Sequence, residues 1–280
     1  MLTIFFGLTS AVCWGTSDFL GGRFTRKYPA FTVALVSHSA GLILVLLLAA
    51  IVRPEVHAEA VRWGLAAGLI TSFGGLALYQ GLATGDAGVV ATLSGCGAVV
   101  PVVFAFATGD APSAVQTAGI AMALAGGVLA SLPAEGVHFA SSGHLRPLLL
   151  GVASAVGFGL FFVLIDRGAK TDSDALTVLV MARFGAVIFV GGAGLLARGL
   201  RWPGRDLPRL AVVGSIDMTA NGSFALATIR GNVAVAAVLA SLYPLQTLVL
   251  SRFLTSERFT RLRILGAALA LAGVAAISVA

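Results

Sequence analysis

The chain has 280 residues, of which 58% are hydrophobic and only 11% are charged, and its formal net charge is +6. A soluble domain carries about 25% charged residues, and here the charges lie mostly in short clusters between long apolar stretches, so a soluble globule is excluded. The positive balance does not indicate nucleic-acid binding, because no run or face collects enough Lys and Arg, and the composition instead predicts an integral membrane protein in a lipid bilayer.

Ten segments of the sequence are long and apolar enough to be transmembrane helices, which need about 20 mostly apolar residues each. They lie at residues 2–22, 31–52, 61–83, 88–108, 114–132, 145–165, 174–198, 208–229, 232–254 and 260–279. Short connections that carry Pro, Gly or Asp separate them. We therefore expect an all-α integral membrane protein in which ten helices form one transmembrane domain.

Two stretches of the first half of the chain recur, in the same order, in the second half. Residues 7–15 (GLTSAVCWG) resemble residues 151–159 (GVASAVGFG), and residues 116–126 resemble residues 263–273. The offset between the copies is nearly the same for both pairs, which makes chance similarity between Ala- and Gly-rich helices a poor explanation. The sequence therefore predicts an internal repeat.

The predicted boundary divides the chain into repeats of five helices each, residues 1–135 and residues 136–280. Because five is an odd number, the two repeats must enter the membrane from opposite sides, so their topology is inverted. Inverted repeats are typical of secondary transporters, whose substrate site lies at the repeat interface near the middle of the membrane. A duplicated scaffold with another function is the less favoured interpretation.

Three short motifs give the sequence a resemblance to a known family. Residues 14–15 (WG) lie in the first span, Pro101 and Pro244 take equivalent places in spans four and nine, and residues 271–274 (LAGV) close span ten. Together they resemble the ten-helix EamA-type members of the drug/metabolite transporter superfamily over nearly the whole chain. The Glu-Arg pair usual after spans four and nine occurs only once, at residues 257–258.

The resemblance implies export or exchange of small metabolites, amino acids or drugs. It places a central cavity among spans one, three, four, six, eight and nine. We accordingly expect a multi-pass protein of the bacterial inner membrane.

The orientation of the chain stays open. More Lys and Arg residues lie in loops after odd-numbered spans than in loops after even-numbered spans, and the positive-inside rule then places both termini outside the cytoplasm. The family resemblance implies the opposite orientation, with both termini inside.

Four ionisable side chains fall inside predicted spans, where a central charge costs about 2.5–3.5 kcal/mol on insertion scales. They are Asp18, His38, Arg183 and Asp217. Arg183 and Asp217 lie in neighbouring spans, and as a pair they could meet a charged or zwitterionic substrate or join two helices as a structural ion pair. The sequence favours neither interpretation. His38 is expected to be a helix–helix hydrogen-bond partner rather than a proton relay.

Asp217 and Asp18 are the candidates for proton coupling. Burial of Asp18 in the first span would make it a proton carrier. Its place near the end of that span slightly favours a solvated, inert carboxylate at the level of Arg23. Without a titrating carboxylate, transport would be facilitated diffusion.

Uncharged side chains of the cavity-lining spans complete the predicted substrate site. With Arg183 and Asp217, this site comprises Trp14, Tyr79, Gln80, Phe158, Asn221, Tyr243 and Gln246. Phe161, Phe162 and Phe224 could extend an aromatic wall, although a phenylalanine in a span ordinarily faces lipid or core. Pro101 and Pro244 are predicted hinges, because each removes a helical hydrogen bond and frees a carbonyl group four residues earlier.

Several kinds of chemistry are not indicated. Cys13 and Cys96 each lie in an apolar stretch, so they predict neither a disulfide framework nor a metal site. No basic stretch precedes the first apolar segment, which we expect to be kept as a span rather than cleaved. The sequence contains no P-loop, no His/Glu metal spacing and no nucleophile–base constellation. We therefore expect no cofactor, no metal ion, no nucleic-acid partner and no enzymatic activity.

Taken together, these features predict a secondary transporter or exporter of small organic metabolites, with amino acids as the first class to consider, that works by alternating access. Two other classes stay open. An integral-membrane enzyme acting on lipids would need acid, base or nucleophilic groups clustered at one interface. A non-transporting subunit or receptor would need no polar lining at mid-depth. A monomer would suffice for transport, and the sequence does not determine the oligomeric state.

Overall fold

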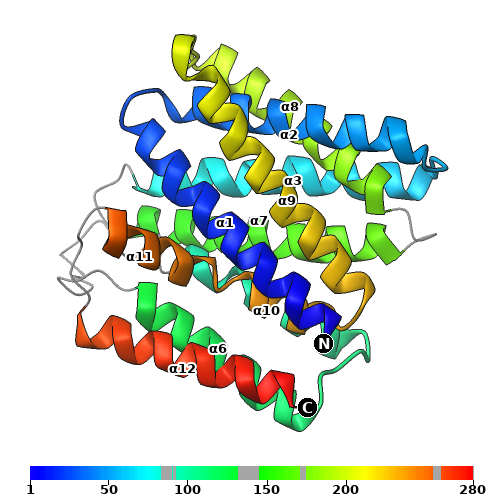
Figure 1. Ribbon diagram of the computed structural model, residues 1–280, viewed down its shortest axis with the longest axis vertical. Coiled ribbons are helices and arrows are strands. Elements are labelled where there is room, and N and C mark those ends of the chain that lie inside the picture. Colours follow the sequence, from blue (N-terminus) through cyan, green and yellow to red (C-terminus); the bar gives the residue numbers. More distant parts are fainter. Residues whose placement is uncertain (83–89, 91–92, 132–144, 171–174, 255–259, 280) are drawn as a thin grey trace.

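The computed structural model describes residues 1–82, 90, 93–131, 145–170, 175–254 and 260–279. In these ranges all regular structure is helical, in agreement with the predicted class. The elements are α1 (Leu2–Thr25), α2 (Ala30–Val52), α3 (Ala58–Leu82), η1 (Cys96–Ala98), α5 (Val99–Ala107), α6 (Ala114–Ser131), α7 (Leu145–Lys170), α8 (Ala175–Leu196), η2 (Gly204–Asp206), α9 (Leu207–Ile229), α10 (Val233–Ala240), α11 (Tyr243–Leu254) and α12 (Arg261–Ser278). Figure 1 shows them as an elongated bundle. The predicted repeat boundary between residues 135 and 136 lies outside the described residues, as does the Glu-Arg pair at 257–258.

Seven helical segments are long and apolar enough to cross a membrane, judged by length and composition. They correspond to predicted spans two, three, six, seven, eight, nine and ten. Two shorter apolar helices, Leu93–Ala107 and Ala114–Ala130, lie where spans four and five were expected, and α1 covers the first predicted span. Large apolar side chains such as Leu47 and Ile51 of α2 are exposed on the outside of the bundle, as expected where helices contact lipid. The chain is thus a multi-pass membrane protein.

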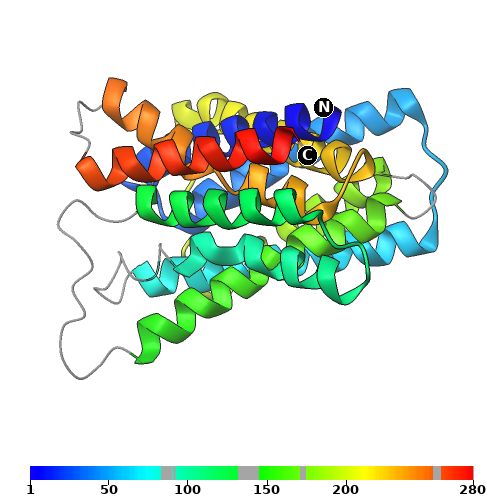
Figure 2. The same ribbon diagram turned by 90° about the horizontal axis from the view of Figure 1, so that it is seen from below.

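The third helix of each half packs against helices of the other half. α3 packs against α7 and α8, while α9 packs against α1 and α2. The repeat pairs α1 with α7, α2 with α8 and α3 with α9, so each contact in one half has its counterpart in the other. α2 and α8 also pack on each other, and so do α6 and α12, which lie side by side in Figures 1 and 2.

The contact between α6 and α12 shows the relative direction of two repeat-equivalent helices. A Cβ atom on Gly119 would lie 2.8 Å from the carbonyl oxygen of Gly273, and one on Gly126 would lie 2.6 Å from that of Gly266. In the sequence repeat, however, Gly119 corresponds to Gly266 and Gly126 to Gly273. The start of one helix therefore meets the end of its counterpart, and the two helices run antiparallel.

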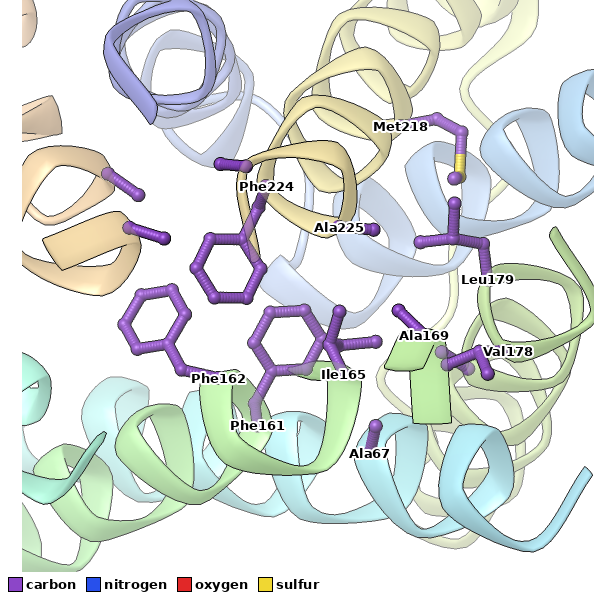
Figure 3. Close-up of a cluster of buried hydrophobic side chains, with 14 of the residues drawn as sticks. Ala67, Phe161, Phe162, Ile165, Ala169, Val178, Leu179, Met218, Phe224 and Ala225 are labelled. Carbon is purple, nitrogen blue, oxygen red and sulfur yellow. The ribbon is translucent and has the colours of Figure 1, made fainter. Parts of the chain in front are cut away.

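The main apolar core lies between α7, α8 and α9. Phe161, Phe162 and Ile165 project from α7 toward Phe224 of α9, as Figure 3 shows. Phe224 is fully buried. This core holds α7 against α9 and forms the inner boundary of the site described below.

A polar contact fixes one end of α9 to the loop between α1 and α2. Asp206, buried at the end of η2, forms an ion pair with Lys27 and accepts a hydrogen bond of 2.8 Å from the Tyr28 hydroxyl group. Arg209 lies 3.2 Å from the same carboxylate. The hydrogen bond to Asp206 raises the pKa of Lys27 above its ordinary value, so this lysine stays charged.

At two repeat-equivalent glycines, Gly68 and Gly214, neighbouring helices approach closely. This close approach predicts how substitutions at the two positions change the stability of the protein. A Cβ atom on Gly68 of α3 would overlap the carbonyl oxygen of Ala182, and one on Gly214 of α9 would overlap that of Ser37. We expect Gly68→Ala and Gly214→Ala each to destabilise the protein by about 1–3 kcal/mol through overpacking, seen as a lower Tm in detergent.

The matched controls lie in the same two helices. A Cβ atom on Gly75 of α3 or on Gly222 of α9 would meet no atom within 4 Å. Gly75→Ala and Gly222→Ala should therefore keep or raise the Tm, because alanine favours a helix over glycine by about 1 kcal/mol. An equal loss in all four variants would contradict the assignment of close approach to Gly68 and Gly214.

Candidate functional site

Arg183 of α8 is the centre of a buried polar cluster that joins three helices. Its Nη2 atom lies 2.5 Å from Oδ2 of Asp217 on α9, and its Nη1 atom lies 2.7 Å from Nδ1 of His38 on α2. Its Nε–H group donates to the sulfur atom of Met218, 3.2 Å away. The side chain of Arg183 is only 6% exposed. All three nitrogen atoms of the guanidinium group therefore contact protein side chains, and Nη2 meets Asp217 as an ion pair without a hydrogen bond.

The contact with Arg183 determines the protonation of His38. A guanidinium group only donates hydrogen bonds, so Nδ1 of His38 must accept and cannot carry a proton. His38 is then the neutral tautomer with its proton on Nε2. The predicted helix–helix role of His38 agrees with this geometry.

Glycine residues allow α2 and α9 to approach closely enough for this cluster to form. A Cβ atom on Gly41 of α2 would lie 3.4 Å from Nε of Arg183 and 3.3 Å from Cβ of Met218. Gly214, one turn before Asp217, lies directly on the backbone of Ser37. The small residues of α2 and α9 thus make room for the long side chain of Arg183.

The side chain of Asp217 is more exposed than that of Arg183. The side chain of Asp217 is 20% exposed although it is paired, so part of the carboxylate can be reached. Asn221, one turn further along α9, is buried, and its amide group donates a hydrogen bond of 2.6 Å to the backbone carbonyl of Asp217. Asn221 therefore supports the position of Asp217 within α9.

Asp18 is exposed, yet it lies on the inward face of α1. With 3.6 residues per turn, Asp18 shares a face with Gly7, Ala11 and Trp14, and the glycine and the alanine on that face are buried. On the opposite face, Phe5 is 62% exposed. An exposed carboxylate on the inward face indicates accessible space inside the bundle.

No hydrogen bond or ion pair to Asp18 occurs among the described residues. Its carboxylate interacts electrostatically with that of Asp217 and with Tyr243. The predicted neighbour, Arg23, is an exposed residue one and a half turns further along α1 and on its other side.

Trp14 lies one helical turn before Asp18 and forms the partly exposed edge of an aromatic cluster. Its ring centroid lies 5.7 Å from that of Phe162 and 6.0 Å from that of Phe224. The phenylalanine rings are buried and Trp14 is half-buried. Trp14 therefore covers the apolar core from the same face of α1 that carries Asp18.

α11 packs on the same stretch of α1. The side-chain amide of Gln246 donates to Oγ1 of Thr16 at 3.3 Å, and the hydroxyl group of Thr247 donates to the carbonyl oxygen of Gly15 at 3.0 Å. A side chain on Gly15 would overlap the backbone of Tyr243. α11 thus packs on α1 within one turn of Trp14 and Asp18, and both Tyr243 and Gln246 are half-buried at this contact. Thr16, the partner of Gln246, lies on the side of α1 opposite Asp18.

The remaining predicted site residues lie elsewhere or cannot be placed. Phe158 is half-buried on α7 and lies against Gly97 of η1, whereas Phe161 and Phe162, about one turn further, contact Trp14. Gln80 is exposed at the end of α3. The side chain of Tyr79 lies outside the described residues.

Both predicted hinge prolines lie just after a break in regular helix. α10 ends at Ala240, four residues before Pro244, and η1 contains Gly97, four residues before Pro101. These are the residues whose carbonyl groups lose a helical partner. A side chain on Gly159 of α7 would overlap the carbonyl oxygen of Gly97, so that oxygen is covered by a helix and serves close packing.

The site offers little for inorganic cofactors. Within the described ranges, no group of three His, Cys, Asp or Glu side chains could hold a metal ion. Its chemistry is that of one accessible carboxylate, one paired carboxylate, an indole face and uncharged hydrogen-bonding groups.

Comparison with known proteins relates both halves of the chain to one family. A family model described as the EamA-like transporter family matches residues 1–132 and matches again residues 145–279. Among solved structures, one crystal structure is similar with a TM-score of 0.78 and 20% sequence identity, covering 99% of this chain and 96% of that chain. At this identity the likeness demonstrates a shared fold. No curated protein matches the chain.

The Arg183–Asp217 pair can be tested by a double-mutant cycle. Removing one partner leaves the other charge buried without compensation, so Arg183→Met and Asp217→Asn should each lower the Tm. The double variant should lose less than the sum of the two, with a coupling of about 1–3 kcal/mol. The comparison pair is Asp166–Lys170 on α7, 2.8 Å apart, in which Asp166 is 4% and Lys170 38% exposed; because Lys170 keeps part of its hydration, we expect a smaller coupling there. Additive losses at Arg183 and Asp217 would contradict a buried, coupled pair.

Proposed function

Since this chain belongs to the EamA-like transporter family, we propose that it is a secondary transporter that moves small organic metabolites, amino acids among them, across the bacterial inner membrane. The observation that carries the proposal is the separate match of the family model to each half of the chain. A family of transporters argues against a lipid-modifying enzyme. The polar groups in the middle of α1, α8 and α9 argue against a subunit that binds no solute.

The transporter would have ten membrane passes. α1 and the two shorter apolar helices would add to the seven segments that meet the length and composition criteria. The two termini lie at the same end of the bundle in Figures 1 and 2. An even number of passes brings both ends of a chain to one side of a membrane, whereas seven would separate them. This placement supports ten passes.

The two repeats, residues 1–135 and 136–280, would have inverted topology. The antiparallel contact between α6 and α12 supports this, since repeat-equivalent helices that run in opposite directions are what an inverted pair requires. The exchange of partners between α3 and α9 supports it as well. Alternating access would then follow from rocking of one repeat against the other.

Proton coupling would depend on the carboxylates of this site. Asp18 and Asp217 lie close enough to interact electrostatically, so a proton held by one would influence the other. Pro244, whose half-buried neighbours Tyr243 and Gln246 belong to the site, would link movement of α11 to substrate binding.

Transport itself is tested by uptake into proteoliposomes with a panel of amino acids, amines and other small metabolites. We expect protein-dependent flux for at least one class and at least a tenfold loss in Trp14→Ala, because the indole face borders the site. Trp202→Ala is the matched control, since Trp202 is 75% exposed in the connection between α8 and α9. If folded protein gives no flux for any solute, the transporter proposal fails.

The inverted topology is tested by labelling two repeat-equivalent connections from opposite sides. Two variants each introduce one cysteine: Glu55→Cys in the connection between α2 and α3, and Trp202→Cys in the connection between α8 and α9. The two connections lie at opposite ends of the bundle in Figure 1. An impermeant maleimide should label one in intact cells and the other only after permeabilisation, and the parent chain controls for Cys13 and Cys96. Labelling of both from one side would contradict inversion. The same experiment determines the orientation of the termini.

A further inference from the structure

We propose that the site selects an organic cation, namely a protonated amine that carries an aromatic or apolar group, and that Asp18 is its counter-ion. This inference rests on the proposed transport function and narrows its substrate class. It would replace the zwitterionic substrate that the Arg183–Asp217 pair first suggested.

The first step concerns the basic side chain. A substrate carboxylate needs an available cation, and Arg183 is the only cation that α1, α2, α8 and α9 carry away from their first and last turns. Its three nitrogen atoms already contact Asp217, His38 and Met218, and its side chain is 6% exposed. An anionic or zwitterionic ligand would have to break this buried arrangement, which is costly.

The second step concerns the balance of charge. Two carboxylates, Asp18 and Asp217, face one guanidinium group, and His38 is neutral because its Nδ1 atom accepts from Arg183. With both carboxylates ionised, the cluster carries one net negative charge in the interior of a membrane protein. A charge at this depth requires compensation. The accessible group is Asp18, which has no partner among the described residues, so either a proton or a cationic ligand at Asp18 neutralises this charge.

The third step concerns the groups beside Asp18. Trp14 lies one turn away on the same face of α1, with its indole ring half-buried and supported by Phe162 and Phe224. An indole face attracts a cation with about 0.5–2 kcal/mol and also packs against apolar groups. Tyr243, whose backbone packs on Gly15, interacts electrostatically with Asp18 and adds a hydroxyl group to this region.

These groups together recognise an ammonium ion next to an aromatic ring and repel a carboxylate. Phenethylamine and phenylalanine make a sharp comparison, because they share a phenyl ring and an amine and differ by one carboxylate. 3-Phenylpropionate carries only the acid, and 2-phenylethanol is neutral. We expect the full-length protein to bind phenethylamine at least tenfold more tightly than any of the other three.

Binding is measured by quenching of tryptophan fluorescence in detergent and by competition with radiolabelled phenethylamine. Asp18→Asn should weaken phenethylamine binding at least tenfold, while Asp18→Glu retains it and Glu59→Gln, an exposed carboxylate at the start of α3, changes nothing. Trp14→Ala should weaken binding and Trp14→Phe should preserve part of it. If Asp18→Asn does not fold, the ligand comparison on the natural sequence and the Trp14 variants still decide the proposal.

Two results would overturn the proposal: equal or tighter binding of phenylalanine or phenylpropionate, or unchanged phenethylamine binding in folded Asp18→Asn. The transport assay separates this failure from failure of the proposed function. Flux of amino acids without flux of amines leaves a transporter with a different selectivity. No flux of any solute rejects transport itself.

Discussion

The architecture of the site depends on one buried guanidinium group. A guanidinium that is withdrawn from water must find acceptors for its nitrogen atoms, because an unpaired buried charge is far more costly than a paired one. Arg183 finds a hydrogen-bond acceptor in His38 on α2 and an opposite charge in Asp217 on α9. These contacts bring together helices from both halves of the chain. They also occupy the basic group, which leaves Asp18 as the accessible charge.

In the Arg183 cluster, a histidine at the position equivalent to Arg183 avoids repulsion between two like charges. Residues 32–33 (TV) align with residues 177–178 (TV) in the predicted repeat, which puts His38 and Arg183 at equivalent positions, and the helices that carry them, α2 and α8, pack on each other. Because the side chains at these two positions meet, arginine at both would bring two like charges into contact. A neutral histidine at one place converts that contact into a hydrogen bond of 2.7 Å. The two halves thus keep one backbone arrangement and carry complementary side chains.

The sequence was enough to predict most of the helices. It predicted contacts between site residues only where the prediction did not depend on the exact position of a side chain along and around its helix. Apolar length and breakers placed the helices, and adjacency of spans seven and eight suggested the Arg183–Asp217 pair. The repeat put Trp14 and Phe158 in register, yet Phe161 and Phe162 pack on Trp14. A shift of three or four residues turns a side chain through nearly a full circle and moves it one turn along the axis. Repeat offsets that vary by a few residues cannot determine such positions.

Asp18 illustrates the remaining gap between sequence and site. Its place near the end of the span concerns its depth and suggested a solvated carboxylate, and its helical phase adds that it lies on the inward face with Ala11 and Trp14. Its counterpart in the second half, by the register that aligns residues 7–15 with 151–159, is Phe162, a buried ring that packs on Trp14. One half therefore contributes the charge and the other contributes the apolar wall. Both halves match the same family model, but the unequal side chains at these positions give the site its own chemical character.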